Sequence, residues 1–361
     1  MNAALLYGPN NIKIENIKIE NNSNDCLILK VLSCSVCSYD VRTFRNGSFK
    51  VKPPVILGHE ICAETTREFS GQDYSIKPQE RVSVYPIIPC LCCWYCNHKK
   101  YNLCSNLKEI GSTMNGGFAE YISIPRAVVE IGGIIPVLDN VTNEEASLIE
   151  PLACCINGIN QIKSLDFESI VIIGDGPIGL MQLMLLKKNF PENRVIIIGK
   201  IKHRLEMAKR LGADEVYDVK NINNCEPISK LFTELNGKRS PNLIFISNNN
   251  IESLRVAFGL ANKNGSVIIF SGLKNPTSHP GNLDNSPIID ANFIHYNQIS
   301  VMGSFSSTPV NLKEAMELVN SGEIKIKDLI TNTFELQNLE NAIRISESFE
   351  GFKSVINRFD I

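Results

Sequence analysis

The chain has 361 residues, of which 43% are hydrophobic and 20% are charged, and this composition excludes a largely disordered protein. Its 36 basic and 38 acidic residues leave a net charge of −2, which argues against nucleic acid or an anionic membrane surface as a partner. No apolar run reaches the roughly 18 residues of a membrane span. The N-terminal segment 1–8 contains no basic residue, so we predict no signal peptide and a cytoplasmic protein.

Residues 1–130 contain short runs that are typical of β-strands. Isoleucines at 12, 14, 17 and 19 are separated by polar residues, and a second apolar run spans Cys26 to Leu32. Further short runs, bounded by Gly, Pro and Asn, continue to Pro125. This pattern predicts a small antiparallel or barrel-like domain with long loops.

The pattern changes near Glu150, beyond which apolar strands alternate with helices. The strands are expected at 170–173, 195–198, 243–246 and 267–270, and the helices at 178–186, 204–211 and 251–260. Strands that are apolar on both faces predict a parallel sheet covered by helices on both sides. Thr308 followed by Pro309 is typical of the start of a further helix.

Twelve cysteines are the most unusual feature of the composition. Without an export signal we expect a reducing compartment, where cysteines more often bind metal or act in catalysis than form disulfides. Four of them, Cys90, Cys93, Cys96 and Cys104, follow the order C-x2-C-x2-C-x7-C. Four thiolates on one short loop suit a closed tetrahedral Zn²⁺ site whose role is in folding.

Alternatives remain for this loop. Cys92 and His98 lie in the same segment, and either could replace one of the four ligands. Iron–sulfur clusters use similar spacing, but the Pro expected after the fourth cysteine is absent. A chance cluster of buried thiols is the last alternative. The other cysteines are interpreted as ordinary core or surface residues: Cys26, Cys34, Cys62, Cys154, Cys155 and Cys225.

Cys37, His59 and Glu150 form a second set of potential metal ligands. Cys37 follows one apolar run, His59 follows another, and Glu150 stands at the end of the β-rich region. One thiolate, one imidazole and one carboxylate leave an open coordination position, as catalytic zinc requires. Each residue alone is better explained as part of a core or a turn, so the prediction depends on the order of the motifs.

That order resembles the zinc-dependent medium-chain dehydrogenase/reductase family, which contains alcohol dehydrogenases. The motifs are Cys-x-x-Asp at 37–40, Gly-His-Glu at 58–60, the four-cysteine loop, Gly-Gly-Phe-Ala-Glu-Tyr at 116–121, Glu-Pro-Leu-Ala at 150–153 and a glycine fingerprint at 174–179. They are most similar to the polyol, sugar and threonine dehydrogenase branch. The resemblance covers nearly the whole chain.

The resemblance implies an α/β chain of two domains. A GroES-like β-rich catalytic domain would comprise residues 1–152 and 295–361, with a structural-zinc lobe near 88–106. A Rossmann domain with a doubly wound parallel sheet would comprise residues 153–294. The resemblance also suggests a homodimer or a homotetramer.

The same resemblance assigns roles to five residues. Cys37 and His59 would be ligands of a catalytic zinc ion. Glu60 would be a further ligand or an exchangeable carboxylate behind the ligands, and Glu150 would coordinate directly or through water. Asp40 would orient the site. Together with the four-cysteine loop, this set implies two Zn²⁺ ions per chain.

Tyr39 departs from the family pattern, which usually has Ser or Thr there to pass the substrate proton onward. A tyrosine hydroxyl could do the same. Alternatively, Tyr39 only packs and the proton leaves through water. Arg42 and Arg45 follow on the same segment, where they would either bind an acidic or phosphorylated substrate or belong to the solvated surface.

Gly174, Gly176 and Gly179 form the pattern G-x-G-x-x-G directly after a strand and at the start of a helix. In that context the glycines allow a tight turn and a close approach of the backbone. The helix N-terminus, with Pro177 and Ile178, would face the pyrophosphate of a dinucleotide. The alternative is a purely structural turn between strand and helix.

The end of the next strand bears on the choice of dinucleotide. NAD-binding proteins carry an acid there for the ribose 2′-hydroxyl, whereas this chain has Gly199. A glycine leaves room, and the cations Lys200, Lys202, His203 and Arg204 complement a 2′-phosphate. The sequence therefore favours NADP(H) over NAD(H), unless these cations belong to a solvated face.

Later segments supply three further candidates. Ser247 and Ser271 follow later strands and would line the cofactor crevice. His295 stands in a segment similar to one near the domain junction in this branch, where it would approach the nicotinamide or a neighbouring subunit. A structural role for His295 is the alternative.

These observations predict a zinc-dependent oxidoreductase that transfers hydride between the CH–OH group of a polyol, sugar or small secondary alcohol and NAD(P). Three alternatives remain. An enone or quinone reductase on the same fold would not need the second set of ligands. A zinc-ribbon binding protein would not explain the strand–glycine–helix unit, and a degenerate family member would have lost catalytic ligands.

Overall fold

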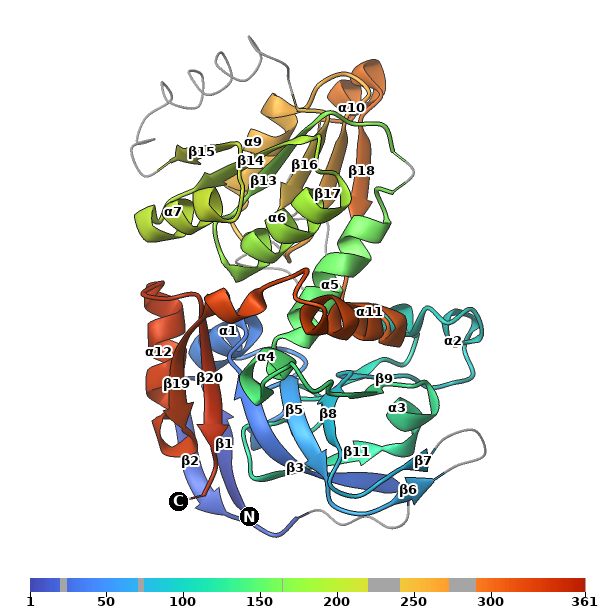
Figure 1. The fold of residues 1–361 in the computed structure, drawn as a ribbon, viewed down its shortest axis with the longest axis vertical. Coiled ribbons are helices and arrows are strands. Elements are labelled where there is room, and N and C mark those ends of the chain that lie inside the picture. Colours follow the sequence, from blue (N-terminus) through green and yellow to red (C-terminus); the bar gives the residue numbers. More distant parts are fainter. Residues whose placement is uncertain (20–24, 71–74, 164, 220–240, 273–289, 361) are drawn as a thin grey trace. The chain divides into compact units, whose positions relative to one another are not determined.

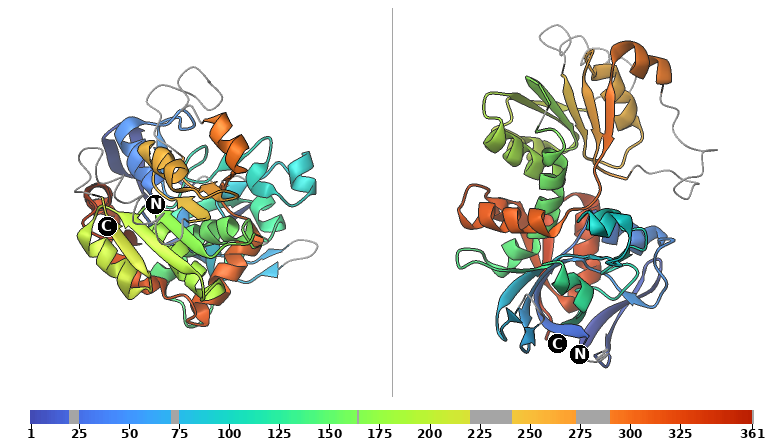
Figure 2. Two further views of the ribbon diagram at one scale, coloured as in Figure 1. Left: turned by 90° about the horizontal axis from the view of Figure 1, so that it is seen from above. Right: turned by 90° about the vertical axis from the view of Figure 1, so that its right-hand side faces the viewer.

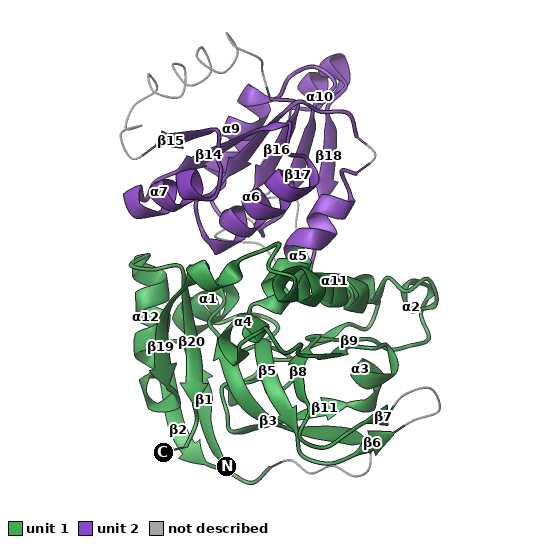
Figure 3. Cartoon of the chain, viewed as in Figure 1, with its two compact units in different colours: residues 1–154, 306–361 green, residues 155–305 purple. Residues whose placement is uncertain are grey.

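The computed structural model describes residues 1–19, 25–70, 75–163, 165–219, 241–272 and 290–360, so Cys225 lies outside the described residues. The chain forms two compact units, one of residues 1–154 and 306–361 and the other of residues 155–305 (Figure 1, Figure 3). The first unit resumes at 306 rather than at the predicted 295. The reason is strand β18 (Ser300–Gly303), which pairs with β17 (Ser266–Ile269) and so belongs to the second unit.

The first unit is built around a seven-stranded, mainly antiparallel sheet in the order β12-β8-β5-β3-β20-β19, with β11 also paired to β3. Strand β20, near the end of the chain, lies beside β3 with Val355 opposite Ser35. This pairing brings the last strand close to the segment that leads into Cys37. The strands are β3 (Cys26–Ser35), β5 (Glu60–Thr65), β8 (Arg81–Val84), β11 (Tyr121–Pro125), β12 (Ile134–Pro136), β19 (Ile330–Glu335) and β20 (Lys353–Arg358).

Smaller sheets and short helices complete the first unit. A three-stranded sheet has the order β2-β1-β4, and its strand β2 ends at Asn16, before the predicted limit of Ile19. The remaining strands are β1 (Asn2–Gly8), β2 (Asn11–Asn16), β4 (Val55–Ile56), β6 (Phe69–Ser70), β7 (Ser75–Ile76), β9 (Ile87–Ile88) and β10 (Lys108–Glu109). The helices are α1 (Ser38–Asn46), α2 (Trp94–Asn97), α3 (Arg126–Glu130), α4 (Asn143–Ser147), α11 (Pro309–Asn320), α12 (Leu339–Ser348) and the 3-10 turns η1 (Tyr101–Leu103), η3 (Ile326–Leu329) and η4 (Leu336–Asn338).

Helix α11 begins where Thr308 and Pro309 predicted a helix. The backbone N–H of Thr308 donates to Oδ1 of Asn311 at 3.0 Å, which satisfies one group at the helix start. The apolar residues Leu312, Ala315, Met316 and Val319 are all buried. Among the described residues, no helix is long and apolar enough to cross a membrane.

The second unit contains a six-stranded parallel sheet in the order β15-β14-β13-β16-β17-β18. The first three strands in the chain run outward from the middle of the sheet in one direction and the last three run in the other, which is the doubly wound order of dinucleotide-binding folds. Its strands besides β17 and β18 are β13 (Ser169–Ile173), β14 (Arg194–Gly199), β15 (Glu215–Asp218) and β16 (Leu243–Ile246). This sheet, together with the β-rich first unit, confirms the predicted fold class.

Helices cover both faces of this sheet (Figure 2). On one face, Val171 and Ile244 pack with Leu254 and with Phe293, which come from two different helices. Burying one such side chain contributes about 1.5–3 kcal/mol, so the central strands are strongly held. The helices are α6 (Pro177–Asn189), α7 (Lys202–Arg210), α9 (Glu252–Leu260) and α10 (Ala291–Asn297), while α5 (Ile149–Asn160) begins in the first unit and ends in the second.

Candidate metal and nucleotide sites

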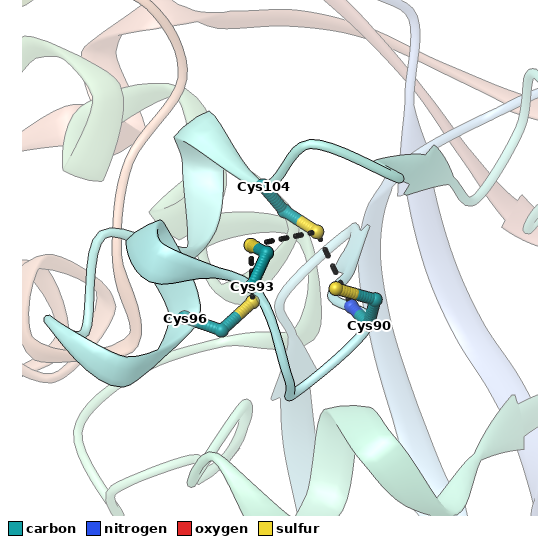
Figure 4. A group of neighbouring side chains, drawn as sticks. All are labelled: Cys90, Cys93, Cys96 and Cys104. Carbon is teal, nitrogen blue, oxygen red and sulfur yellow. Dashed lines mark hydrogen bonds between the residues drawn. The ribbon is translucent and has the colours of Figure 1, made fainter.

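The four predicted cysteine ligands meet in the loop that carries α2 and η1 (Figure 4). The Sγ atom of Cys93 lies 3.5 Å from that of Cys96 and 3.9 Å from that of Cys104. Four sulfurs bound to one zinc ion at about 2.3 Å in a tetrahedron lie about 3.8 Å apart. The donor set and its spacing therefore fit a closed zinc site.

The two alternative ligands of this loop lie outside the group of four. The Sγ atom of Cys92 is 3.7 Å from that of Cys90, but the Cys92 side chain is exposed. The ring of His98 stacks on that of Trp94 with centroids 4.0 Å apart, and its Nδ1 lies 2.7 Å from the Trp94 carbonyl oxygen. His98 is thus engaged with its own helical turn.

Cys37, His59 and Glu60 form a second group, in which one potential ligand atom from each side chain lies within 4.8 Å of the others. Cys37 caps α1, and His59 stands between Gly58 and the start of β5. Gly58 has φ +91°, and a Cβ there would lie 2.7 Å from Sγ of Cys34. Only glycine fits this turn, which presents His59 beside Cys37.

Asp40 ties these two segments together from a fully buried position. Its Oδ2 accepts the backbone N–H of Cys37 at 2.9 Å, and its Oδ1 accepts that of Gly58 at 3.2 Å. Its Oδ1 also lies 3.8 Å from Nδ1 of His59. Contacts of this kind orient metal ligands from behind.

Glu60 is held by two residues that the sequence analysis did not single out. The hydroxyl of Ser35 and the ammonium of Lys353 both donate to Oε2 of Glu60. Lys353 also donates to the carbonyl oxygen of Val36 at 3.0 Å. No described residue donates to Oε1 of Glu60, so this oxygen remains available to a ligand.

The charges in this group have clear electrostatic consequences. Burial disfavours a positive charge on His59, but the charges of Cys37 and Asp40 outweigh it and hold the pKa of His59 well above its usual range. Burial also disfavours the Lys353 ammonium, yet Glu60 and Cys37 more than compensate and raise the pKa of Lys353. The group therefore favours positive charge, as a cation-binding site should.

Glu150 lies near this group but not within it. Burial is the main cause that raises the pKa of Glu150; His59 opposes this shift and Glu60 adds to it. Oε1 of Glu150 accepts from the thiol of Cys154 at 3.2 Å. The structure thus gathers Cys37, His59 and Glu60, with Glu150 in electrostatic reach.

Tyr39 lies between the second group and a pair of serines. Its ring meets that of His59 edge-on, with centroids 5.9 Å apart. Its hydroxyl lies 2.8 Å from Oγ of Ser112 and donates to Oγ of Ser48 at 3.4 Å. Both earlier interpretations of Tyr39 find support here, because the ring packs and the hydroxyl joins a chain of hydroxyls.

Of the two arginines on α1, Arg45 is engaged in an ion pair. Its guanidinium donates to both carboxylate oxygens of Glu347, with Nε at 2.9 and 2.8 Å from them. It also donates to the side chain of Asn10 at 2.6 Å. Arg45 therefore holds α12 against α1, which agrees with the surface interpretation.

In the second unit, Gly174 and Gly176 stand in the turn between β13 and α6, and Gly179 lies in the first turn of α6. A Cβ on Gly179 would lie 2.0 Å from the carbonyl oxygen of Gly174, so this close approach requires glycine. Pro177 is the first residue of α6 and Ile178 the second. The turn thus has the shape that a pyrophosphate-binding loop needs.

The space expected at Gly199 is filled, contrary to the sequence-based argument. A Cβ on Gly199 would lie 2.5 Å from both Cβ and Oδ2 of Asp175, the second residue of the glycine turn. Among the expected cations, Lys200 is exposed, whereas Arg204 is only 5% exposed. Sequence reasoning missed Asp175, although an acid inside a glycine motif is visible in the sequence.

The structure also places three other predicted residues of the second unit. The hydroxyl of Ser247 donates to Oε1 of Gln182, and the backbone N–H of Ser271 donates to the carbonyl oxygen of Ile246 at 3.3 Å. Both residues follow strands at the same edge of the sheet, as predicted. His295 lies in α10, where its ring contacts that of Tyr296.

Two family descriptions match the chain. Residues 23–132 match the alcohol dehydrogenase GroES-like domain, and residues 177–321 match the zinc-binding dehydrogenase. The D-arabitol-phosphate dehydrogenase of Enterococcus avium is 29% identical over 90% of this chain and 88% of its own length. The sorbitol dehydrogenase of Bacillus subtilis is 28% identical over 97% of this chain and 94% of its own length.

Solved structures show the same architecture. A protein from Sinorhizobium meliloti, described as a zinc-binding dehydrogenase and solved with NADP, has a TM-score of 0.84 at 26% identity over 99% of this chain and 98% of its own. An alcohol dehydrogenase from Escherichia coli CFT073, solved with NADH, has the same TM-score and identity over 99% of each chain. The similarity therefore extends through both units.

Proposed function

The chain belongs to the zinc-type medium-chain alcohol dehydrogenase family, in its polyol dehydrogenase-like branch, and we propose that it oxidises the CH–OH group of a polyol, a sugar or a small secondary alcohol with NAD(P). The observation that carries this proposal is the convergence of Cys37, His59 and Glu60. A thiolate, an imidazole and a carboxylate form the donor set of a catalytic zinc site with an open position. A degenerate member would have lost part of this set.

The residues of the first unit would hold two zinc ions in different ways. Cys90, Cys93, Cys96 and Cys104 would enclose one, and Cys37, His59 and Glu60 would hold the other. When bound, zinc at the second group supplies a Lewis acid for the alcohol hydroxyl, and a nicotinamide supplies the hydride acceptor. Asp40 fixes the directions of Cys37 and His59 through its two backbone contacts.

Tyr39 provides a route for the proton that leaves the alcohol. Its hydroxyl lies 2.8 Å from Oγ of Ser112 and donates to Oγ of Ser48 at 3.4 Å. As Oη of Tyr39 accepts the proton of the alcohol, its own proton would pass to Oγ of Ser48, and the hydroxyl proton of Ser48, which is only partly buried, would leave to water. A hydroxyl chain of this kind performs the task of the Ser or Thr that other members carry. We propose this relay in preference to packing alone.

Of the three cations that follow Tyr39 closely in the chain, Arg45 and Lys50 are paired with carboxylates, whereas Arg42 forms no ion pair with the described residues. Arg45 is paired with Glu347, and Lys50 donates to Glu109 at 2.9 Å. A cation in a phosphate site keeps its charge available to the ligand. Arg45 and Lys50 are instead paired within the protein. Although one relative acts on D-arabitol phosphate, we propose a neutral polyol or secondary alcohol for this chain.

The nicotinamide cofactor would be held by the glycine turn of the second unit. Gly176 and Gly179 would offer backbone N–H groups at the start of α6, whereas that of Gly174 donates to the carbonyl oxygen of Ile198 at 2.9 Å. The sequence favours NADP(H) for two reasons, the cations Lys200 and Arg204 and the space beside Gly199. In the structure, Asp175 occupies that space. The predicted homodimer or homotetramer stays a prediction.

A substrate panel tests this function. The purified protein, loaded with zinc, is incubated with polyols, sugars, sugar phosphates and short secondary alcohols, each with NAD and with NADP, while the reduced nicotinamide is followed by absorbance. We expect turnover with at least one polyol or secondary alcohol and weaker turnover with sugar phosphates. No turnover with any alcohol, in protein that retains its zinc, would support the degenerate alternative instead.

A further inference from the structure

A carboxylate stands at the end of β14, although β14 itself ends in glycine. A Cβ on Gly199 would lie 2.5 Å from Oδ2 and 2.6 Å from Cγ of Asp175. Asp175 belongs to the turn after the neighbouring strand β13. The carboxylate of Asp175 thus lies where the side chain of an acidic residue at position 199 would start. The adjacent turn supplies the acid that β14 lacks.

This carboxylate is fixed in position. Oδ2 of Asp175 accepts the backbone N–H groups of Lys200 and Ile201, both at 2.7 Å. Hydrogen bonds to an ionised acceptor are among the stronger ones in proteins, and the residue is only 9% exposed. Within the part of the chain that the structure describes, Oδ1 of Asp175 accepts no hydrogen bond, so it can accept one from a ligand.

We propose that Asp175 is the residue that determines cofactor specificity: its free oxygen accepts the adenosine ribose 2′-hydroxyl, and its charge selects NAD(H) against NADP(H). The inference rests on the dehydrogenase function proposed above. In doubly wound folds an acid at the end of the second strand binds this hydroxyl. A fixed carboxylate at the same place repels a 2′-phosphate, so the preference is the reverse of the one expected from the sequence.

The cations around Asp175 do not reverse this selection. Burial lowers the pKa of Arg204 and the charge of Asp175 opposes the shift, which places the two groups in electrostatic reach. Lys200, Lys202 and His203 are exposed, and solvent and salt screen exposed charges far more than buried ones.

Direct binding of both dinucleotides, measured by calorimetry, tests the proposal without relying on turnover. We expect the unmodified protein to bind NADH more tightly than NADPH. Asp175→Asn keeps the shape and can still accept from both backbone N–H groups, but it removes the charge. We expect it to lower the ratio of NADH to NADPH affinity about tenfold, which corresponds to about 1.4 kcal/mol.

Asp218→Asn is the matched control. Asp218 ends β15, lies opposite Gly199 in the sheet and is exposed. The substitution therefore removes one negative charge from the same sheet edge and leaves the carboxylate of Asp175 in place. We expect the ratio of NADH to NADPH affinity to stay unchanged. Gly199→Asp would be a poor test, because the new side chain would collide with Asp175.

Several outcomes would overturn the proposal. Tighter binding of NADPH by the unmodified protein would do so even if Asp175→Asn failed to fold. An unchanged ratio of NADH to NADPH affinity in folded Asp175→Asn would also overturn the proposal, as would an equal shift of this ratio in Asp218→Asn. Either result would leave the proposed dehydrogenase function intact. Absence of binding to either dinucleotide would overturn both this proposal and the proposed function.

Discussion

The four-cysteine group lies within residues 90–104, whereas Cys37, His59 and Glu60 depend on contacts across the first unit. Asp40 reaches Gly58 over 18 residues, and Lys353 reaches Glu60 over 293. A local group can assemble as its own loop folds, while the second group exists only when β3, β5 and β20 are paired. The first arrangement suits a metal that stabilises folding, and the second suits one held in a prepared position for chemistry.

Cys37→Ala should distinguish most clearly between the roles of the two metal-binding groups. Because the second group loses its thiolate, we expect turnover to fall to background, while the free energy of unfolding changes little since the four-cysteine group is untouched. Activity and urea unfolding are the measurements. Cys26→Ala, a cysteine outside both groups, should retain activity, and substantial turnover in Cys37→Ala would contradict the proposed mechanism.

Cys93→Ser should have the opposite signature. Structural zinc binding provides folding free energy on the order of 10 kcal/mol in small zinc domains, so losing this ligand should lower the stability of the first unit by several kcal/mol. The measurement is thermal unfolding with and without a chelator. Cys92→Ser, which removes an exposed thiol beside the group, is the control and should leave the melting temperature nearly unchanged.

Lys353→Met tests the long-range support of Glu60. Removing one partner of a buried ion pair typically costs about 3–5 kcal/mol, because the other charge is left without compensation. We expect that loss of stability together with faster release of one zinc ion to a chelator. Lys353→Arg should restore part of both, and Lys313→Met, at an exposed position of α11, should affect neither. Zinc retention equal to that of the unmodified protein would show that Lys353 does not position Glu60.

Tyr39→Phe should have the smallest effect on the fold and a selective effect on the reaction. General acid–base groups typically contribute about 100-fold or more to the rate, so loss of the hydroxyl should lower kcat by at least about 100-fold if Tyr39 relays the proton. Stopped-flow measurement of hydride transfer checks this, with the exposed Tyr296→Phe as the control. An unchanged kcat in Tyr39→Phe would favour packing alone.

Local patterns predicted most of what the structure contains. The spacing of the cysteines, the glycine turn and the apolar strands each depend on neighbours within a few turns of chain, so the sequence displays them directly. Helix α11 and the four buried strands β13, β14, β16 and β17 were predicted in this way. The fold class followed from the alternation of these strands with helices.

Features that depend on distant residues were not predictable in the same way. Lys353 meets Glu60 only because β20 pairs with β3, and nothing in the local sequence around Lys353 indicates that pairing. Asp175 fills the space beside Gly199 because parallel strands β13 and β14 end at the same sheet edge. The return to the first unit was predicted at 295 from the family resemblance, and the pairing of β18 with β17, which keeps residues up to 305 in the second unit, is a contact between separate segments.

Elemental analysis of zinc in the unmodified protein and in Cys37→Ala shows directly whether the chain holds a second, catalytic metal ion. We expect two zinc ions per chain in the unmodified protein and one in the variant, with the remaining ion held by the group of Cys90, Cys93, Cys96 and Cys104. A single zinc ion in the unmodified protein that is retained in Cys37→Ala would contradict the assignment of a catalytic metal site to Cys37, His59 and Glu60.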